Sequence, residues 1–300
     1  MAGFGSSLFF YRACLAAAIN LGRVLIIAEG DLPHANLLEP WTNCPMPSPD
    51  DQDVMRCTFY GDGDIDFEAR TDSSYVEPPA ALWHVGRLWW GVHALAFLAR
   101  PRSDLAPQGF DAHRHAGIHV RRTDKHHEAP VVPVIDFLRQ LDHVGGSAPI
   151  SVRVVTDDPD TVLPDFDISR QRCRRTFSLA VDGDPGHTND SVIDGVIDLQ
   201  YSDPLVVTFS SNFAHWAMAL KIIHDLETGR SGRIAVLDAE WFGWLVVDQS
   251  RLLGAEWITN ASIARRAGKS CGGSFYAYRD LAQRRTTCTW TTVRFRYSFR

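Results

Sequence analysis

The sequence lacks three features that would fix its class at once: a strong charge of one sign, a dense set of cysteines and a long uninterrupted hydrophobic run. A formal net charge of -6 over 300 residues gives no overall positive field for nucleic acid or an anionic membrane. The 6 cysteines form no CxxC pair and no zinc-ligand spacing with histidine. Disulfide bonds remain open, with Cys44 and Cys57 as the closest candidate pair.

The apolar stretch near the start of the chain, residues 8–28, is interrupted by Arg12, Asn20 and Arg23. These polar side chains disfavour a membrane-spanning helix and a signal peptide. We expect a helix over residues 6–21 and a short strand over residues 23–28. No targeting segment and no membrane contact are predicted for this chain. Walker A and GxGxxG motifs are also missing, which disfavours kinases, P-loop ATPases and dinucleotide-dependent dehydrogenases.

Length and composition are typical of a globular α/β protein. Hydrophobic residues make up 45% of the chain, and its length suits two units of about 100–150 residues. A helix is predicted over residues 83–99, ended by Pro101, and the Pro-, Asp- and Gly-rich residues 101–111 mark a boundary. The predicted units are an N-terminal α/β domain (residues 1–105), a Rossmann-like domain (residues 106–250) and a tail of undefined structure (residues 251–300).

The second unit repeats one pattern: a short apolar run that ends in a polar cluster. The runs cover residues 116–120, 151–155, 205–209 and 233–237. Helical segments lie between them, for example residues 134–144 and 213–226. Strands that alternate with helices predict a parallel sheet. Ligands of such sheets bind beyond the carboxyl ends of the strands, where all four polar clusters would lie.

Cationic side chains follow the first of these strands. Arg121 presents a planar guanidinium that matches phosphate oxygens in two-point geometry, so a pyrophosphate group is its expected ligand. Arg122 points to the opposite side of an extended chain. We expect Arg122 to be largely structural and to pair with Asp124 or Asp158.

Residues 208–212 (TFSSN) follow a strand and open a helix. Hydroxyl groups and free backbone N–H groups at a helix N-terminus form an anion site, while an ordinary N-cap is the alternative. Their position opposite the two arginines favours the phosphate interpretation.

Two clusters are weak candidates for a metal site. Residues 62–73 lack the glycine and glutamate of an EF-hand loop. Two interpretations remain for this segment: a metal-binding DxD pair formed by Asp62 and Asp64, or a solvated acidic loop. Residues 126–128 (HHE) are adjacent and their side chains diverge, so no metal is expected there.

Several segments resemble the α1,6-fucosyltransferases that modify the core of N-glycans. Residues 117–125 (GIHVRRTDK) are similar to the first donor-binding motif of that family, and residues 156–159 (TDDP) to the second. Residues 195–198 (GVID) and 202–211 (SDPLVVTFSS) resemble the third. Other stretches agree in order, namely residues 3–5 (GFG), 22–27 (GRVLII), 89–90 (WW), 98–101 (LARP), 237–238 (LD) and 241–243 (WFG).

The resemblance implies a two-domain GT-B-type enzyme that uses GDP-fucose, acts with inversion and needs no metal or other cofactor. The first domain would then lie on the acceptor side and the second would bind the GDP-sugar. A glycan or glycoprotein is the implied acceptor. The Golgi lumen or secretory pathway is the implied location.

The resemblance also implies roles for individual residues. Arg121 would bind the β-phosphate, while His119 and an aspartate of the third motif would hold the guanosine. The implied donor site comprises His119, Arg121, Arg122, Asp158, Asp194, Asp198, Ser210 and Ser211. The implied catalytic group comprises Arg121, Asp124, Lys125 and Glu128.

The chain departs from the family pattern in its spacing. Glu128 stands one residue closer to Lys125 than in the family, the third motif is short after Asp198, and Asn212 replaces a glutamine. We expect Glu128 to be the general base, because neighbouring cations lower the pKa of Asp124 and make it a poor proton acceptor.

Two other functions stay open. The first is a metal-dependent glycosyltransferase that uses Asp62 and Asp64, which sensitivity to EDTA would reveal. The second is a non-catalytic nucleotide-sugar or glycan-binding protein of the same fold, for which GDP binding without turnover would be the sign.

Overall fold

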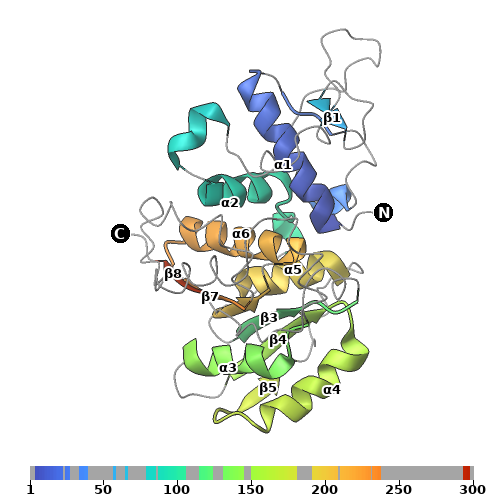
Figure 1. The fold of residues 1–300 in the computed structure, drawn as a ribbon, viewed down its shortest axis with the longest axis vertical. Helices are drawn as coiled ribbons and strands as arrows, with labels where there is room; N and C mark the ends of the chain where they lie inside the picture. Colours follow the sequence, from blue (N-terminus) through green and yellow to red (C-terminus); the bar gives the residue numbers. More distant parts are fainter. Residues whose placement is uncertain are drawn as a thin grey trace, which may run out of the picture.

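The computed structural model describes fourteen segments of the chain, namely residues 4–22, 24–27, 34–39, 57–58, 65–66, 79–85, 87–105, 115–123, 131–144, 150–180, 191–208, 210–230, 232–237 and 293–297. Its centre is a six-stranded sheet of order β5-β4-β3-β6-β7-β8 (Figure 1). The strands are β3 (His115–Val120), β4 (Ile150–Thr156), β5 (Phe177–Leu179), β6 (Leu205–Val207), β7 (Gly232–Val236) and β8 (Val293–Tyr297).

The first five strands of this sheet run parallel. β3 pairs with β4 on one side and β6 on the other, and β5 and β7 extend the sheet outward. β8 pairs antiparallel with β7, so a strand from the segment expected to be a tail completes one edge. The order of the five parallel strands is that of a doubly wound sheet. The predicted α/β class with a parallel sheet is confirmed.

Helices cover both faces of the sheet (Figure 1). α3 (Val134–Val144) and α4 (Pro159–Arg170) share one buried cluster with side chains such as Ile118 and Val206. α5 (Ser191–Tyr201) and α6 (Asn212–Glu227) share a second cluster with Leu205 and Val207. The central strands are buried on both faces, which is why they read as continuous apolar runs.

The N-terminal helices lie on the α6 side of the molecule. α1 (Phe4–Asn20) and α2 (Arg87–Leu98) contribute Leu8 and Leu95 to the same buried cluster as α5 and α6. The indole N–H of Trp216 in α6 donates to the carbonyl of Ala99, just after α2, at 2.7 Å. The other described elements are η1 (Ala35–Leu37), β1 (Cys57–Thr58), β2 (Ile65–Asp66), η2 (Ala80–Val85) and η3 (Ser103–Leu105).

This continuous packing bears on the expected domain organisation. Residues from before and after the predicted boundary at 105/106 share one core cluster, which runs from α1 and α2 to the sheet. The only strands described within residues 1–105 are β1 and β2, of two residues each. The two-domain GT-B arrangement therefore stays a prediction.

Two local predictions for the first hundred residues need correction. The helix expected over residues 83–99 is divided between η2 and α2. The strand expected over residues 23–28 is wrong for its described part, residues 24–27, which form no strand. α1 ends in a turn at Gly22, whose φ of 64° is the left-handed conformation typical of a helix C-terminus, and Val24 beyond it is 65% exposed.

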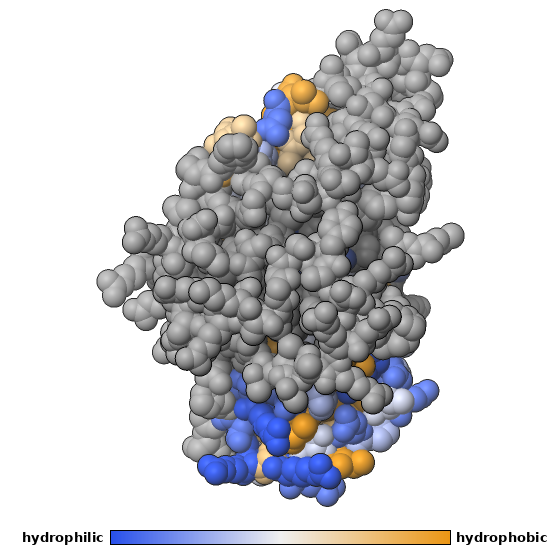
Figure 2. All heavy atoms as spheres, viewed as in Figure 1, coloured by the Kyte–Doolittle hydropathy of each residue, from blue (hydrophilic) through white to orange (hydrophobic). Residues whose placement is uncertain are grey.

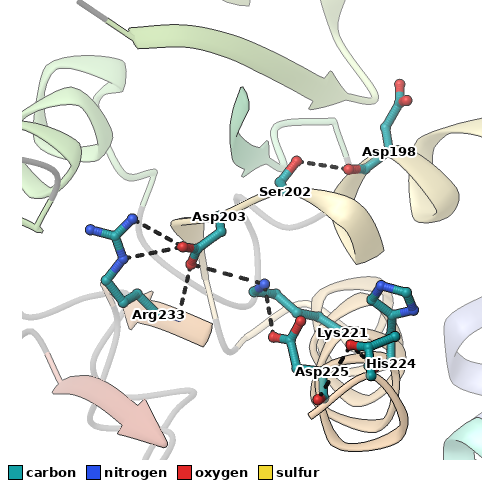
Figure 3. Close-up of polar contacts among 8 residues, drawn as sticks. Asp198, Ser202, Asp203, Lys221, His224, Asp225 and Arg233 are labelled. Atoms are coloured by element: carbon teal, nitrogen blue, oxygen red, sulfur yellow. Dashed lines mark hydrogen bonds and ion pairs between the residues drawn. The ribbon is translucent and has the colours of Figure 1, made fainter. Parts of the chain in front are cut away.

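A polar network ties the sheet to α6 at the amino ends of the strands (Figure 3). Asp203, just before β6, accepts from the Arg233 guanidinium at 2.9 Å and from the Arg233 backbone N–H at 2.9 Å. The ammonium of Lys221 lies 3.0 Å from Asp225 and 4.0 Å from Asp203. The network balances two cations with two carboxylates, so the buried Lys221 is compensated.

The described surface at the lower end of the molecule is mainly hydrophilic (Figure 2). Exposed charges on α4 and the turn after it have both signs, for example Asp160, Asp167, Arg170 and Arg172. None of the described helices combines the length and the apolar composition that crossing a bilayer requires.

Candidate functional site

The candidate site lies at the carboxyl ends of β3 and β6. From β3 the chain proceeds to β4 and β5 on one side of the sheet, whereas β6 leads to β7 on the other. Such a reversal of strand order opens a crevice between the two central strands, and this is where doubly wound sheets bind ligands. The residues that follow β3, β4 and β6 therefore form the candidate site.

His119 is the last inward-facing residue of β3 on the side of α5 and α6. Its side chain is buried, with only 4% of the residue exposed, and its ring packs on Phe213 of α6 with centroids 4.8 Å apart. The pKa of His119 is lowered to about 3, mainly by burial and then by the charge of Arg121, with Asp157 opposing. His119 is therefore neutral at physiological pH, and its buried Nδ1 has no hydrogen-bond partner within the described part of the chain.

Ser211 occupies the N-cap position of α6, directly after β6. The residue is completely buried, and its hydroxyl makes no capping bond and meets no other partner in the segments that the structure describes. The ordinary N-cap interpretation of this serine therefore lacks its hydrogen bond. A buried hydroxyl left unpaired costs about 1–3 kcal/mol, which a ligand at the N-terminus of α6 would recover.

Asp157 organises the loop that carries Arg121. Its carboxylate accepts hydrogen bonds from the backbone N–H of Arg122 at 2.8 Å, from the backbone N–H of Thr123 at 3.2 Å and from the Thr123 hydroxyl at 2.6 Å. The guanidinium Nε of Arg121 lies 3.4 Å from the same carboxylate. The loop after β3 is thus held in place by the first residue after β4.

The pKa of Asp157 reflects this role. Burial acts to raise it, but the hydrogen bonds from Thr123 and Arg122 and the charge of Arg121 outweigh burial, so the pKa lies below its usual value. Asp157 is not among the site residues predicted from the sequence. Val120 and Thr156 are register partners at the ends of β3 and β4, and this pairing is the signal that places Asp157 beside Arg121.

Arg122 and Asp158 each contact a side chain of α4. The guanidinium of Arg122 lies 3.5 Å from Asp165 of α4, whereas the sequence predicted a pair with Asp124 or Asp158. Asp158 is the N-cap residue of α4, and its carboxylate accepts a hydrogen bond from the Thr161 hydroxyl. The expected pair with Asp158 is wrong, since Arg122 contacts Asp165 and the carboxylate of Asp158 accepts from Thr161 instead.

α5 brings two expected carboxylates to the same face of the sheet as His119. Asp194 lies in its first turn, and Asp198 is buried one turn further from the carboxyl edge. Gly195 between them allows a close approach, because a side chain there would lie 2.8 Å from Val155 Cγ1. Ser210 lies in the turn between β6 and α6, next to Ser211.

The expected acceptor-side residues Asp124, Lys125 and Glu128 lie outside the described residues, as do Asp62 and Asp64. No cluster of histidine, cysteine, aspartate or glutamate suited to a metal ion occurs in the described part of the chain.

The described residues at this edge offer three kinds of contact. Ser211 supplies a hydroxyl at a helix N-terminus, Arg121 supplies a fixed cation, and His119 supplies a neutral imidazole. The first two suit an anion such as a phosphate, and the third suits an uncharged polar group. One ligand that carries both groups would satisfy all three residues.

Neither the family models nor the curated proteins match this chain. The resemblance to α1,6-fucosyltransferases therefore rests on the motif residues themselves.

Proposed function

We propose that the protein transfers fucose from GDP-fucose to a glycan, with inversion at the anomeric carbon and without a metal ion. The observation that carries this proposal is a pair of buried polar atoms without partners among the described residues, His119 Nδ1 and Ser211 Oγ, at the reversal of strand order. A buried polar atom without a protein partner is completed by a ligand or by water, and these two atoms lie together where a doubly wound sheet binds its ligand.

Described residues are available for both parts of the donor, the diphosphate and the guanosine. Arg121 and the N-terminus of α6 contact the diphosphate, since both favour negative charge. His119 contacts the guanosine as a neutral group that donates at one ring nitrogen and accepts at the other. Asp194 or Asp198 provides the carboxylate for the donor groups of guanine.

The three motif segments that carry the resemblance support this donor. Residues 117–125, 156–159 and 202–211 are far apart in sequence, yet β3, β4 and β6 end side by side in one sheet. Their polar residues therefore meet at one edge, as a shared ligand requires. This agreement favours a nucleotide diphosphate donor over an unrelated small anion.

The reaction proceeds in one displacement. The acceptor hydroxyl oxygen forms a bond to C1 of fucose while the bond from C1 to the β-phosphate oxygen breaks. Glu128 takes the proton of the hydroxyl, and Arg121 with the N-terminus of α6 stabilises the charge that develops on GDP. This charge stabilisation replaces the divalent cation that other glycosyltransferases use.

The test is a transfer assay with GDP-fucose and a panel of N-glycans in the presence of EDTA, with UDP-galactose and UDP-N-acetylglucosamine as competing donors. We expect one fucose added per acceptor, release of GDP and no transfer from the UDP-sugars. Reversible loss of transfer in EDTA would instead favour the metal-dependent alternative at Asp62 and Asp64. Tight GDP binding without any turnover would favour the binding-protein alternative.

A further inference from the structure

Phe213 is an aromatic residue of the candidate site that neither the motifs nor the roles above use. It lies in the first turn of α6, two residues after Ser211, and its ring is tilted by 33° to the ring of His119 at a centroid distance of 4.8 Å. A side chain at Gly195 would lie 3.7 Å from Phe213 Cζ, so α5 also approaches this ring. Phe213 therefore stands between His119 and the two helices that cover this face.

The ring of Phe213 is itself fixed from behind. Trp216 packs edge-on against it with centroids 5.8 Å apart and an interplanar angle of 88°. Trp216 is fully buried and anchored by its hydrogen bond to the Ala99 carbonyl. The chain of contacts runs from the end of α2 through Trp216 and Phe213 to His119, with both aromatic pairs in favourable geometries.

We infer that Phe213 is a positioning residue of the nucleotide site: it keeps His119 dry and in one orientation, so that the imidazole meets the nucleotide as a neutral hydrogen-bonding group. Since the nucleotide is the ligand under the proposed function, this role rests on that function. A neutral imidazole has one acceptor nitrogen, and a protonated one has none. Loss of the Phe213 ring admits water and allows His119 to take up a proton.

The charged groups around the ring do not supply this effect by themselves. Arg121 disfavours the protonated imidazole and Asp157 favours it, so the two act in opposite directions, and burial is the largest influence on its pKa. α5 carries Asp194 and Asp198 on the same side, and α6 carries His215 after Phe213. Burial of His119 under the Phe213 ring is thus the influence on the His119 pKa that a single substitution removes.

The test measures the affinity of GDP-fucose between about pH 5 and pH 8 by calorimetry. GDP-fucose is the probe because its diphosphate is esterified at both ends and lacks the terminal phosphate whose pKa is near 6. The variants are Phe213→Ala, Phe213→Leu and Phe213→Tyr. The control is Phe97→Ala, which removes an aromatic ring that is 50% exposed on α2.

We expect the affinity of the parent protein and of Phe97→Ala to stay constant over this range. Phe213→Ala should bind about tenfold more weakly at pH 8, the scale of one lost hydrogen bond, and weaken further as the pH falls through about 6.5. Phe213→Leu keeps apolar volume for folding but lacks the ring, so it should show the same dependence to a smaller degree. Phe213→Tyr should restore the flat profile.

Two results would overturn the inference while leaving the proposed function intact. One is a Phe213→Ala protein with parental affinity and a flat profile. The other is binding that strengthens as the pH falls, because His119 would then face the diphosphate. If the parent protein binds no GDP-fucose, the proposed function fails, and NMR titration of His119 still decides the positioning role. A His119 that titrates alike in parent and Phe213→Leu contradicts that role.

Discussion

Replacing Asp157 by alanine is the perturbation whose effect the structure defines most closely. The carboxylate accepts three hydrogen bonds from Arg122 and Thr123 and lies beside Arg121, so its removal frees the loop after β3. The loop connects a buried strand to the cation of the candidate site. An ordered loop after β3 therefore contributes both to the stability of the fold and to the position of Arg121.

The magnitude follows from the contacts. A hydrogen bond contributes about 0.5–1.5 kcal/mol net, and the Asp157 side chain is 26% exposed, which argues for the lower end of that range. Loss of the three bonds should therefore lower the free energy of unfolding by about 1.5–2 kcal/mol. Asp157→Asn keeps one acceptor oxygen and should lose about half as much.

The pH dependence of this contribution has a definite sign. Because the folded pKa of Asp157 lies below its unfolded value, the contribution is present above the unfolded pKa and is lost as the pH falls through the folded one. The stability difference between the parent protein and Asp157→Asn should be constant near pH 7 and shrink below about pH 4.

The assay combines urea denaturation with hydrogen exchange of the backbone amides of Arg122 and Thr123. Both amides should be protected in the parent protein and exchange rapidly in Asp157→Ala. Asp160→Ala is the control, since Asp160 is exposed in the first turn of α4 and should change stability by about 0.5 kcal/mol or less. Equal exchange of the two amides in the parent protein and Asp157→Ala would refute the reasoning.

Three further predictions concern charge. Arg121→Ala should lower transfer by about 100-fold or more, and Arg121→Lys should not restore it because the two-point geometry is lost; near-parental turnover of Arg121→Lys would contradict this role. Glu128→Gln should lower transfer by roughly 100-fold while GDP binding persists; parental transfer by this variant would return the role of base to Asp124. Lys221→Ala removes the buried ion pair with Asp225 and should destabilise the protein by about 3–5 kcal/mol in thermal or urea unfolding; a variant as stable as the parent protein would contradict this prediction.

The sheet could be predicted from the sequence because its central strands are buried on both faces. The apolar runs at residues 116–120, 151–155, 205–209 and 233–237 correspond to β3, β4, β6 and β7. β5 has three residues and an exposed Ser178, so no run marked it. β8 joins β7 from far along the chain, and a pairing over that distance leaves no local pattern.

The helices show where a local sequence pattern does not predict the structure. α3 and α6 were predicted because their apolar residues recur at helical spacing. α4 begins at Pro159 and contains Pro164, which favours a loop on local grounds, although burial of Val162 and Phe166 against the sheet holds the helix. Because no helix is predicted from the sequence at α4, Asp165 could not be predicted as the partner of Arg122.

The candidate site was partly accessible to the same reasoning. His119, Arg121 and Ser211 follow or end strands, so a parallel sheet alone brings them to one edge. Asp157 and Phe213 needed strand register and helix packing, which the sequence does not specify residue by residue. The missing bonds of His119 Nδ1 and Ser211 Oγ are properties of the folded chain alone.

The most direct test of the nucleotide site is a calorimetric titration of GDP into the parent protein and into Ser211→Ala, each paired with urea denaturation. Because the Ser211 hydroxyl is buried without a partner among the described residues, its removal should leave stability unchanged or raise it by about 1 kcal/mol. The same change should weaken GDP binding by about tenfold, as the hydroxyl is completed only by the ligand. A parent protein that binds no GDP, or a Ser211→Ala protein that loses stability and keeps parental affinity, would contradict the account.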